Sequence, residues 1–538
     1  MNQQKPRHRV NVVVKYLDTV QLPDSKVPLP EKDLPRWNAL VEKLDARLAV
    51  RRVFTSVSME TIEIMTRLAQ NADSSHSKRA PLPRFENFLW LTYTAADTDD
   101  DTGAERELAD VANLLTDEIA SWASVEMAYV RLPDEDACPP PPLTPPLPLS
   151  DPEHPRQSHQ QHLLPSPAGL NVLAMWALAG GDGAGQHFVD IERGWFFGHA
   201  DLLNASGTQR VMFDNSNGGE NLEVAKSHGT SVLGIVGSTR NHRDVVGMAH
   251  NVASMSAISY YSERDKTTTA DGLMLAGAKV LARRIVEPNT RATSMFNCSV
   301  LLLEAQARLP SSSYAFPVVV YPETFAVIQL LTQLGVTVIE PAGNGWISNV
   351  QSKKTAPRGA EAVDLDRLQD FIKRLPGRHP LKTLKRDAQA ATRPTDTGIK
   401  LEPFQDSGAI MVSMGEWLPD AAGGAGSWKR QKNGNFGSRI DCFAAGQAVS
   451  TLQYAPPVDA HRQLTELFGG TSSASAIIAG AALCVQGVAQ AKLGAPLGSA
   501  ALRAALSDAR CGTASVNGAS DKIGTMPDLV SVAKIHVR

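Results

Sequence analysis

Residues 470–480 read GTSSASAIIAG, and this stretch is the strongest indication of both the fold and the chemistry of the chain. Ser472 follows Gly-Thr in a turn of small residues, and an apolar segment rich in Ala and Gly begins at once. Small residues let the backbone turn tightly and approach a ligand closely. A helix that starts at the serine directs its free N–H groups toward any anion beside the hydroxyl. The pattern therefore indicates a nucleophilic serine, or else a buried helix that begins with serine caps.

Two stretches further upstream supply the groups that a serine nucleophile needs, because its hydroxyl requires a base that is itself held in place. Residues 227–237, SHGTSVLGIVG, contain His228 at the start of another apolar helix. Residues 187–195, HFVDIERGW, form a short apolar strand that ends in a carboxylate, for which we take Asp190.

A fourth stretch, residues 335–345, reads GVTVIEPAGNG and predicts a β-branched strand that leads into Asn344 between two glycines. A side-chain amide at this position can donate a hydrogen bond to a developing oxyanion. The four groups follow one another as Asp, His, Asn and Ser, each at the exit of a strand or the entry of a helix.

This order and these local sequences resemble the subtilisin-like serine peptidases, the subtilase family. The Ser472 motif is similar to Gly-Thr-Ser-x-Ala-Ser-Pro, with Ala476 where the family has proline. The His228 motif resembles His-Gly-Thr-His-Val-Ala-Gly, with a serine in place of the second histidine, and Pro-Ala-Gly-Asn before residue 345 is similar to the oxyanion segment. The Asp190 motif departs most, because the family has Asp-Thr-Gly or Asp-Ser-Gly and the glycine here comes later, in Asp-Ile-Glu-Arg-Gly. The resemblance covers the chain from about residue 165 to its end.

The resemblance implies a serine endopeptidase that hydrolyses peptide bonds in protein or peptide substrates. Ser472 is then the nucleophile, His228 the base, Asp190 the group that orients the histidine, and Asn344 an oxyanion donor. If Asp190 does not hold the histidine, Glu192 is the next carboxylate to consider. No cofactor is required, and structural calcium, which many relatives bind, has no specific motif here.

Two other functions stay open at this point. A subtilase scaffold that no longer cleaves would act as a binding or regulatory module. A serine esterase of the α/β-hydrolase type would place its histidine after the serine and carry a Gly-x-Ser-x-Gly elbow. In this chain His228 precedes Ser472, and the second glycine of the elbow is absent, which argues against the esterase.

The expected substrate cleft contains residues that differ from the family pattern. Residues 300–306, VLLLEAQ, stand where the family has the strand ending Ser-Leu-Gly, which pairs with the substrate backbone. The predicted substrate-binding residues are Glu304, Ala305, Gln306, Pro341, Ala342 and Gly343. The carboxylate of Glu304 either favours basic substrate side chains or turns away and pairs with a neighbour.

The chain divides into three predicted parts. Residues 1–133 alternate apolar and amphipathic stretches in a β-α-β…β-α-β order, which is typical of a ferredoxin-like (split βαβ) α+β domain. This is the fold of subtilase propeptides, and we expect the domain to dock on the catalytic domain; an unrelated α+β module is the alternative. Residues 134–157 are a Pro-rich linker. Residues 158–538 form an α/β domain, a subtilisin-like parallel sheet flanked by helices, with an inserted surface segment in 345–405.

The composition excludes several classes of partner. A net charge of −3 over 538 residues shows no bias toward nucleic acid or anionic membrane. The cysteines are too few and too scattered for a disulfide framework, and no pair has zinc-site spacing, so no metal site is predicted. No uninterrupted apolar stretch suggests a membrane span. The polar first residues contain no signal-peptide core, which predicts a cytoplasmic protein, with leaderless export as the alternative.

Overall fold

The structure is a computed structural model, and it describes residues 8–71, 81–96, 101–134, 160–214, 222–241, 245–261, 269–286, 299–346, 361–375, 406–420, 426–456 and 461–538. The predicted linker lies outside the described residues, apart from Asp134. Of the predicted insertion, residues 347–360 and 376–405 also lie outside them.

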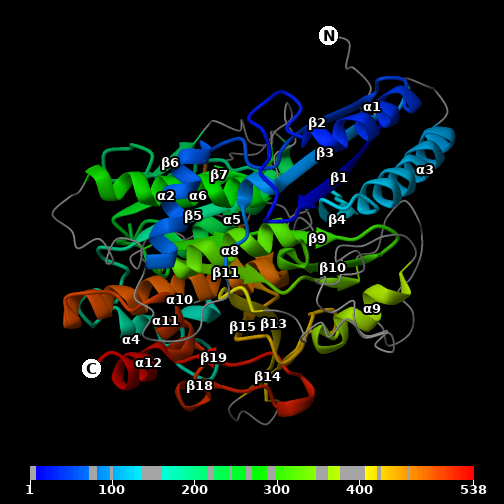
Figure 1. Ribbon diagram of the computed structural model, residues 1–538. Coiled ribbons are helices and arrows are strands. Elements are labelled where there is room, and N and C mark those ends of the chain that lie inside the picture. Colours follow the sequence, from blue (N-terminus) through cyan, green and yellow to red (C-terminus); the bar gives the residue numbers. More distant parts are fainter. Residues whose placement is uncertain are drawn as a thin grey trace.

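A mostly parallel sheet forms the centre of the molecule (Figure 1). Its strands run in the order β14-β13-β11-β8-β5-β7-β6, with β15 beside β13, and only the β13–β14 pair is antiparallel. The sequence prediction of an α/β fold with a parallel sheet is therefore confirmed. The strands are β5 (His187–Glu192), β6 (Val211–Asp214), β7 (Ser254–Ser259), β8 (Ser299–Leu303), β11 (Thr337–Pro341), β13 (Ile410–Leu418), β14 (Ser427–Arg430) and β15 (Cys442–Ala445).

Helices cover both faces of this sheet, so its inner strands are apolar on both sides. In β8, Val300 and Leu302 belong to one apolar core, whereas Leu301 and Leu303 belong to a second core on the opposite face. The first core includes α4 (Val172–Met175), α5 (Glu223–Gly237), α10 (Gly470–Leu493), α11 (Ser499–Leu506) and α12 (Leu529–His536). The second includes α2 (Met59–Asn71), α6 (Thr269–Val286), α8 (Pro322–Gln333) and α9 (Leu368–Arg374).

Short strand pairs complete this part of the chain. β9 (Gln306–Arg308), β10 (Tyr314–Pro317) and β12 (Gly345–Trp346) form a small antiparallel sheet. Two further hairpin-like pairs join β16 (Val449–Leu452) to β17 (Leu464–Phe468) and β18 (Gly512–Thr513) to β19 (Met526–Pro527).

The N-terminal residues form a separate four-stranded antiparallel sheet in the order β2-β3-β1-β4. Two connections, β1-α1-β2 and β3-α3-β4, build it, and α2 lies between them in the chain. This connectivity is that of a split βαβ unit. Its elements are β1 (Arg9–Tyr16), α1 (Leu34–Lys43), β2 (Leu48–Arg52), β3 (Phe88–Thr94), α3 (Asp101–Ala120) and β4 (Val125–Val130).

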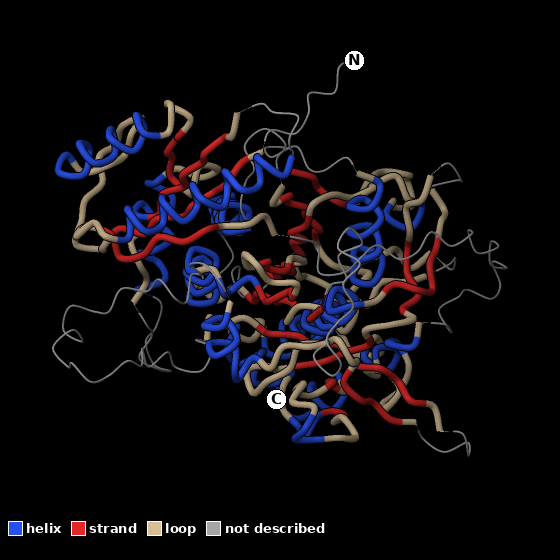
Figure 2. The backbone as a smooth tube through the Cα atoms, turned by 90° about the vertical axis from the view of Figure 1, so that its right-hand side faces the viewer, coloured by secondary structure: helices blue, strands red, loops and turns tan. Residues whose placement is uncertain are grey.

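The N-terminal sheet has one face toward its own helices and the other toward the larger domain. Val12 and Val14 pack in a core with α1 and α3, which lie on the outer side of the molecule (Figures 1 and 2). Val13, on the opposite face of β1, belongs to the core that contains α6 and α8. Because side chains alternate along β1, one face of this strand packs on α1 and α3 and the other face packs on the core that contains α6 and α8.

Polar contacts at the starts of two helices reinforce this interface. Asp271, in the first turn of α6, accepts hydrogen bonds from the backbone and hydroxyl groups of Thr55 and Ser56, at 2.8 to 3.2 Å. Glu323, in the first turn of α8, accepts from Arg131 Nε at 2.9 Å and from the Tyr129 hydroxyl. Carboxylates are favourable at helix N-termini, so these contacts match the polarity of both helices.

Helix α10 runs through the middle of the protein. Among the described residues it is the one helix that is long and apolar enough to cross a membrane by length and composition, contrary to the sequence expectation that no stretch reaches this level. Its most apolar window is wholly buried within the protein. A core helix of a large α/β domain has this character, because neighbours cover it on all sides.

Candidate active site

Ser472 lies in the first turn of α10, where the chain enters the helix from β17. Gly470 has a φ of +76°, a conformation that glycine adopts without a steric cost. The next serine faces another way, because Ser473 Oγ donates to the carbonyls of Ala445 and Gly470. Of these two adjacent serines, only Ser472 directs its hydroxyl at His228, as the sequence motif predicted.

His228 lies in α5 and makes the expected contact with the serine. The His228 Nε2 and Ser472 Oγ atoms are 2.9 Å apart. The close packing of α5 against the loop after β5 requires a glycine at position 229, because a Cβ there would come within 2.4 Å of the Gly194 carbonyl oxygen. The Phe468 ring packs edge-on to the imidazole, with ring centres 5.4 Å apart.

The carboxylate that holds His228 is Glu192, not Asp190. Both Glu192 oxygens lie within hydrogen-bond distance of His228 Nδ1, at 2.8 and 3.0 Å. Asp190 instead accepts a hydrogen bond from Trp195 Nε1 at 2.8 Å. Its other oxygen has no hydrogen-bond partner among the described residues. The prediction that Asp190 orients the histidine is therefore wrong in this structure.

The register along β5 explains this difference. Residues 190 and 192 project from the same face of the strand, because side chains alternate with a period of two. Glu192 is one such repeat closer to the carboxyl end of the strand, the edge at which active sites of parallel sheets form. The sequence contained a signal for it. Reading Glu192-Arg193-Gly194 in place of Asp-x-Gly restores the spacing between carboxylate and glycine.

Burial governs the charge of Asp190. It raises the pKa of Asp190 to about 7, although the hydrogen bond from Trp195 and the neighbouring His228 pull it in the other direction. Asp190 is thus a buried carboxyl group close to the site, and its pKa lies well above the ordinary value of 3.8.

Asn344 follows β11 and is fixed by the start of α10. Its Oδ1 accepts from the Thr471 backbone N–H at 2.8 Å and from the Thr471 hydroxyl at 3.0 Å. A backbone N–H can only donate, so the atom facing it must be the amide oxygen. This defines the direction of the Asn344 NH₂ group, and it places the predicted oxyanion donor beside the residue that precedes Ser472. The sequence did not reveal the role of Thr471 in holding Asn344.

The predicted substrate-binding strand is turned inward in this structure. Glu304 and Ala305 have no exposed surface, and Gln306 is 2% exposed. Glu304 Oε1 accepts from Ser475 Oγ at 2.6 Å, and Gln306 Oε1 accepts from the Asn344 N–H at 3.2 Å. Of the two readings of Glu304, the one in which it pairs with a neighbour is observed. An outward-facing carboxylate in a specificity pocket is not.

The other predicted cleft residues make contacts within the protein. Pro341 ends β11, and Asn435 is hydrogen-bonded to the two residues that follow Pro341. Asn435 Nδ2 donates to the Ala342 carbonyl at 2.8 Å, and the Asn435 N–H donates to the Gly343 carbonyl at 3.3 Å. These contacts hold the loop that carries Asn344.

Two clusters in the described part of the chain contain side chains of metal-binding type, each with the candidate atoms within 4.8 Å of one another: Glu192, His228 and Glu304, and Asp508, Cys511 and His536. In the first, His228 Nδ1 is hydrogen-bonded to Glu192, and His228 Nε2 is hydrogen-bonded to Ser472. In the second, Asp508 is bonded to both Arg510 and His536. We therefore assign neither cluster to a metal, and the expectation that no metal is needed stays a prediction.

Comparisons with known proteins place this site in context. No protein-family model matches the sequence, and no curated protein matches it. Among solved structures, the chain is similar to fervidolysin from Fervidobacterium pennivorans, a keratinolytic enzyme related to subtilisin, with a TM-score of 0.47 and 11% identity. The likeness covers 100% of this chain and 63% of fervidolysin, so the chain spans less than two thirds of that protein. It is also similar to a protease from Pseudoalteromonas arctica, with a TM-score of 0.41 and 19% identity, over 72% of this chain and 99% of the other.

Proposed function

We propose that this protein is a serine endopeptidase whose catalytic group is Ser472, His228 and Glu192. The single observation that carries the proposal is the continuous hydrogen-bonded series from Glu192 through His228 to Ser472, with bonds of 2.8 and 2.9 Å. A nucleophile, a base and a carboxylate that orients the base are the three parts of this chemistry.

Each residue has a distinct task in the proposed reaction. Ser472 Oγ attacks the peptide carbonyl while His228 Nε2 accepts its proton, and the histidine then returns the proton to the leaving amine. Glu192 holds the N–H of His228 Nδ1, which selects the tautomer whose Nε2 can accept the proton. The Asn344 amide donates to the oxyanion that forms in the tetrahedral intermediate. A water molecule, whose proton His228 accepts, then attacks the ester on Ser472 and releases the acid product and the free serine. The reaction thus uses side chains of this chain and water, and requires no cofactor.

A serine-reactive probe tests the assignment of the nucleophile. A fluorophosphonate should label the purified protein at Ser472, and Ser472→Ala should lose both the label and peptidase activity. Ser473→Ala is the matched control, because Ser473 bonds only to backbone carbonyls nearby. Labelling of Ser473, or hydrolysis of esters without hydrolysis of any peptide library, would contradict the peptidase assignment.

One observation favours the second candidate, a scaffold that binds without cleaving. Ser472 and His228 have no exposed surface in this structure. A substrate carbonyl can reach Ser472 only after the surrounding segments move. Failure of the probe to label the folded protein under all conditions, with the fold intact, would favour the binding scaffold over the peptidase.

We further propose that the N-terminal domain assists the folding of the larger domain. The support comes from the shared apolar core and from the two carboxylates, Asp271 and Glu323, that receive its hydrogen bonds. Without the N-terminal domain, the apolar side chains of α6 and α8 that share a core with Val13 would be exposed to water, which is unfavourable.

Separate expression of the domains tests this role. Residues 158–538 alone should fold poorly and recover activity when residues 1–138 are added in trans. The full chain serves as the control for activity. A fragment 158–538 that folds readily, and is neither helped nor inhibited by the added domain, would contradict the proposal.

A further inference from the structure

A second buried carboxyl group, Glu304, lies beside the proposed catalytic group. It follows directly after β8, between β5 and α10, and its side chain has no exposed surface. Oε1 accepts from Ser475, one turn along α10 from Ser472. Oε2 has no hydrogen-bond partner among the described residues. A carboxylate oxygen left without a donor in the interior is costly if the group is ionised.

Burial and a neighbouring negative charge make the ionised form of Glu304 unfavourable. The titratable groups that act on it are Glu192 on β5 and His228 on α5, and carboxylate and ring atoms of the three lie within 4.8 Å of one another. Burial, followed by the negative charge of Glu192, raises the pKa of Glu304 well above its ordinary value of 4.5. His228 and the hydroxyls of Ser475 and Ser472 oppose this rise without cancelling it. Two carboxyl groups therefore face a single histidine.

We propose that Glu304 is a positioning residue of the catalytic site, a carboxylic acid that stays protonated beside Glu192 and holds the start of α10 through Ser475. The inference rests on the proposed peptidase function and adds to it a fourth residue. A protonated Glu304 adds no negative charge at His228, which is bonded to Glu192. A second negative charge would stabilise the imidazolium and keep the histidine from accepting the proton of Ser472.

This role predicts that an uncharged isostere can replace Glu304. Glu304→Gln should keep kcat/KM within about threefold of the wild type and leave the acid limb of the pH profile unmoved, because it replaces one neutral group by another. Glu304→Ala should lower kcat about tenfold with little change in KM, because Ser475 loses its bond to Glu304 and keeps only the carbonyls of Thr471 and Ser472 as acceptors, and a cavity forms. Glu340→Gln is the control, since Glu340 is a different buried carboxyl group, on β11, and should leave activity unchanged.

An acid limb that moves to lower pH in Glu304→Gln would overturn the proposal, because it would mean that the wild-type residue is ionised and raises the pKa of His228. A loss of activity in Glu304→Gln as large as in Glu304→Ala would also overturn it.

A second measurement does not depend on peptidase activity. In a Ser472→Ala background, the free energy of unfolding is compared with and without Glu304→Gln from pH 4 to pH 8. A carboxyl group whose pKa is raised by folding stabilises the protein below its unfolded pKa, and this contribution is lost as the pH rises toward the folded pKa. The Gln variant should therefore gain stability relative to its parent as the pH rises. Glu340→Gln, at a group whose pKa burial raises to about 8, should show the same sign and serves as the positive control.

The outcomes separate the two proposals. If the wild-type protein has no serine reactivity but the stability of Glu304→Gln rises with pH, the peptidase function fails and the protonated Glu304 stands. If the Gln variant shows no such rise while Glu340→Gln does, Glu304 is ionised and the proposal fails, whatever the activity.

Discussion

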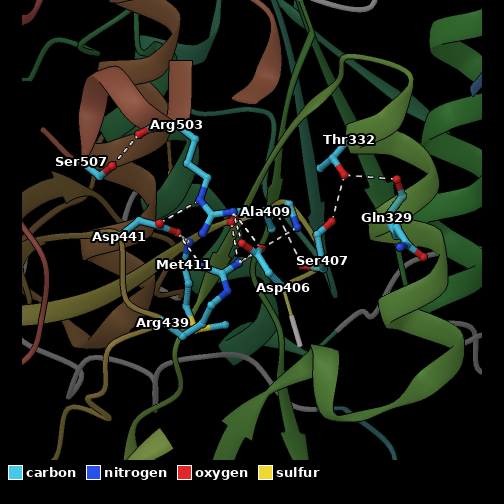
Figure 3. Close-up of polar contacts among 11 residues, drawn as sticks. Gln329, Thr332, Asp406, Ser407, Ala409, Met411, Arg439, Asp441, Arg503 and Ser507 are labelled. Atoms are coloured by element: carbon cyan, nitrogen blue, oxygen red, sulfur yellow. Dashed lines mark hydrogen bonds and ion pairs between the residues drawn. The ribbon is translucent and has the colours of Figure 1, made fainter. Parts of the chain in front are cut away.

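Two polar clusters of this protein differ in how their charges are balanced. Near α11, Arg439 and Arg503 each bind both Asp406 and Asp441, at distances between 2.7 and 3.1 Å (Figure 3). The cluster therefore has two cations for two anions. Around Ser472, by contrast, three buried carboxyl groups, those of Asp190, Glu192 and Glu304, lie near one histidine, His228.

The two clusters shift pKa values in opposite directions. Burial alone raises the pKa of Asp406, but the charges of Arg439 and Arg503 outweigh it and lower the pKa below the ordinary value. Burial also raises the pKa of Asp190 and of Glu304, and here the opposing groups do not compensate. A balanced cluster contributes to stability, whereas an unbalanced one keeps groups ready to exchange protons, which is the property that a catalytic site requires.

The largest effect should come from the carboxylate that holds His228. Glu192→Gln should lower kcat about 10³–10⁴-fold, because the amide no longer favours the tautomer that accepts the proton of Ser472. Steady-state kinetics on a peptide substrate measures it. Asp190→Asn is the matched control, since Asn can still accept from Trp195, and it should change kcat less than about tenfold. The reverse order of the two effects would restore Asp190 as the catalytic carboxylate.

The next effect concerns the oxyanion donor. Asn344→Ala should lower kcat about 10²–10³-fold with little change in KM, the size found when a single oxyanion donor is removed. Thr471→Val keeps the backbone bond to Asn344 and loses only the hydroxyl bond, so kcat should fall less than about tenfold. An Asn344→Ala variant with unchanged kcat would remove the residue from the mechanism.

A substitution in the cluster of Arg439, Arg503, Asp406 and Asp441 should lower the stability of the protein and leave the catalytic rate unchanged. Arg503→Ala removes one cation and leaves Asp441 with fewer partners, which should lower the free energy of unfolding by about 2 kcal/mol. This is less than for a fully buried pair, because Asp406 is about half exposed. Denaturant unfolding measures the loss, and kcat/KM per folded molecule should stay unchanged. A drop in kcat with unchanged stability would mean that the cluster takes part in catalysis.

The smallest effect is a pH dependence of stability at Asp190. Its pKa rises on folding to about 7, so its stabilising contribution is present below the ordinary value of 3.8 and is lost as the pH rises toward 7. Asp190→Asn should therefore gain at least about 1 kcal/mol relative to the wild type between pH 4 and pH 8. Thermal unfolding across this range measures it. A gain at low pH instead would show that Asp190 is ionised and paired in the folded state.

The sequence identified the segments of this protein well and the contacts between them less well. The motif of small residues around Ser472 predicted the start of α10, because a helix that begins beside a reacting group needs small residues. The helix predicted to start at His228 begins earlier, at Glu223. The alternation of strands with helices after residue 158 predicted a parallel sheet flanked by helices, because parallel strands need crossover connections that helices supply. The β-α-β…β-α-β order predicted for residues 1–133 agrees with the connectivity of the N-terminal sheet.

Only the tertiary structure decided which carboxyl group meets His228 and which way Glu304 faces. Strand periodicity puts residues 190 and 192 on one face, but the depth at which α5 crosses that face depends on the packing of whole elements. Likewise, the sequence places Glu304 at the end of β8, while the position of α10 determines that its carboxyl group meets Ser475 and the charge of Glu192. Local sequence thus determines faces and turns, and distances between groups far apart in the chain follow from the packed core.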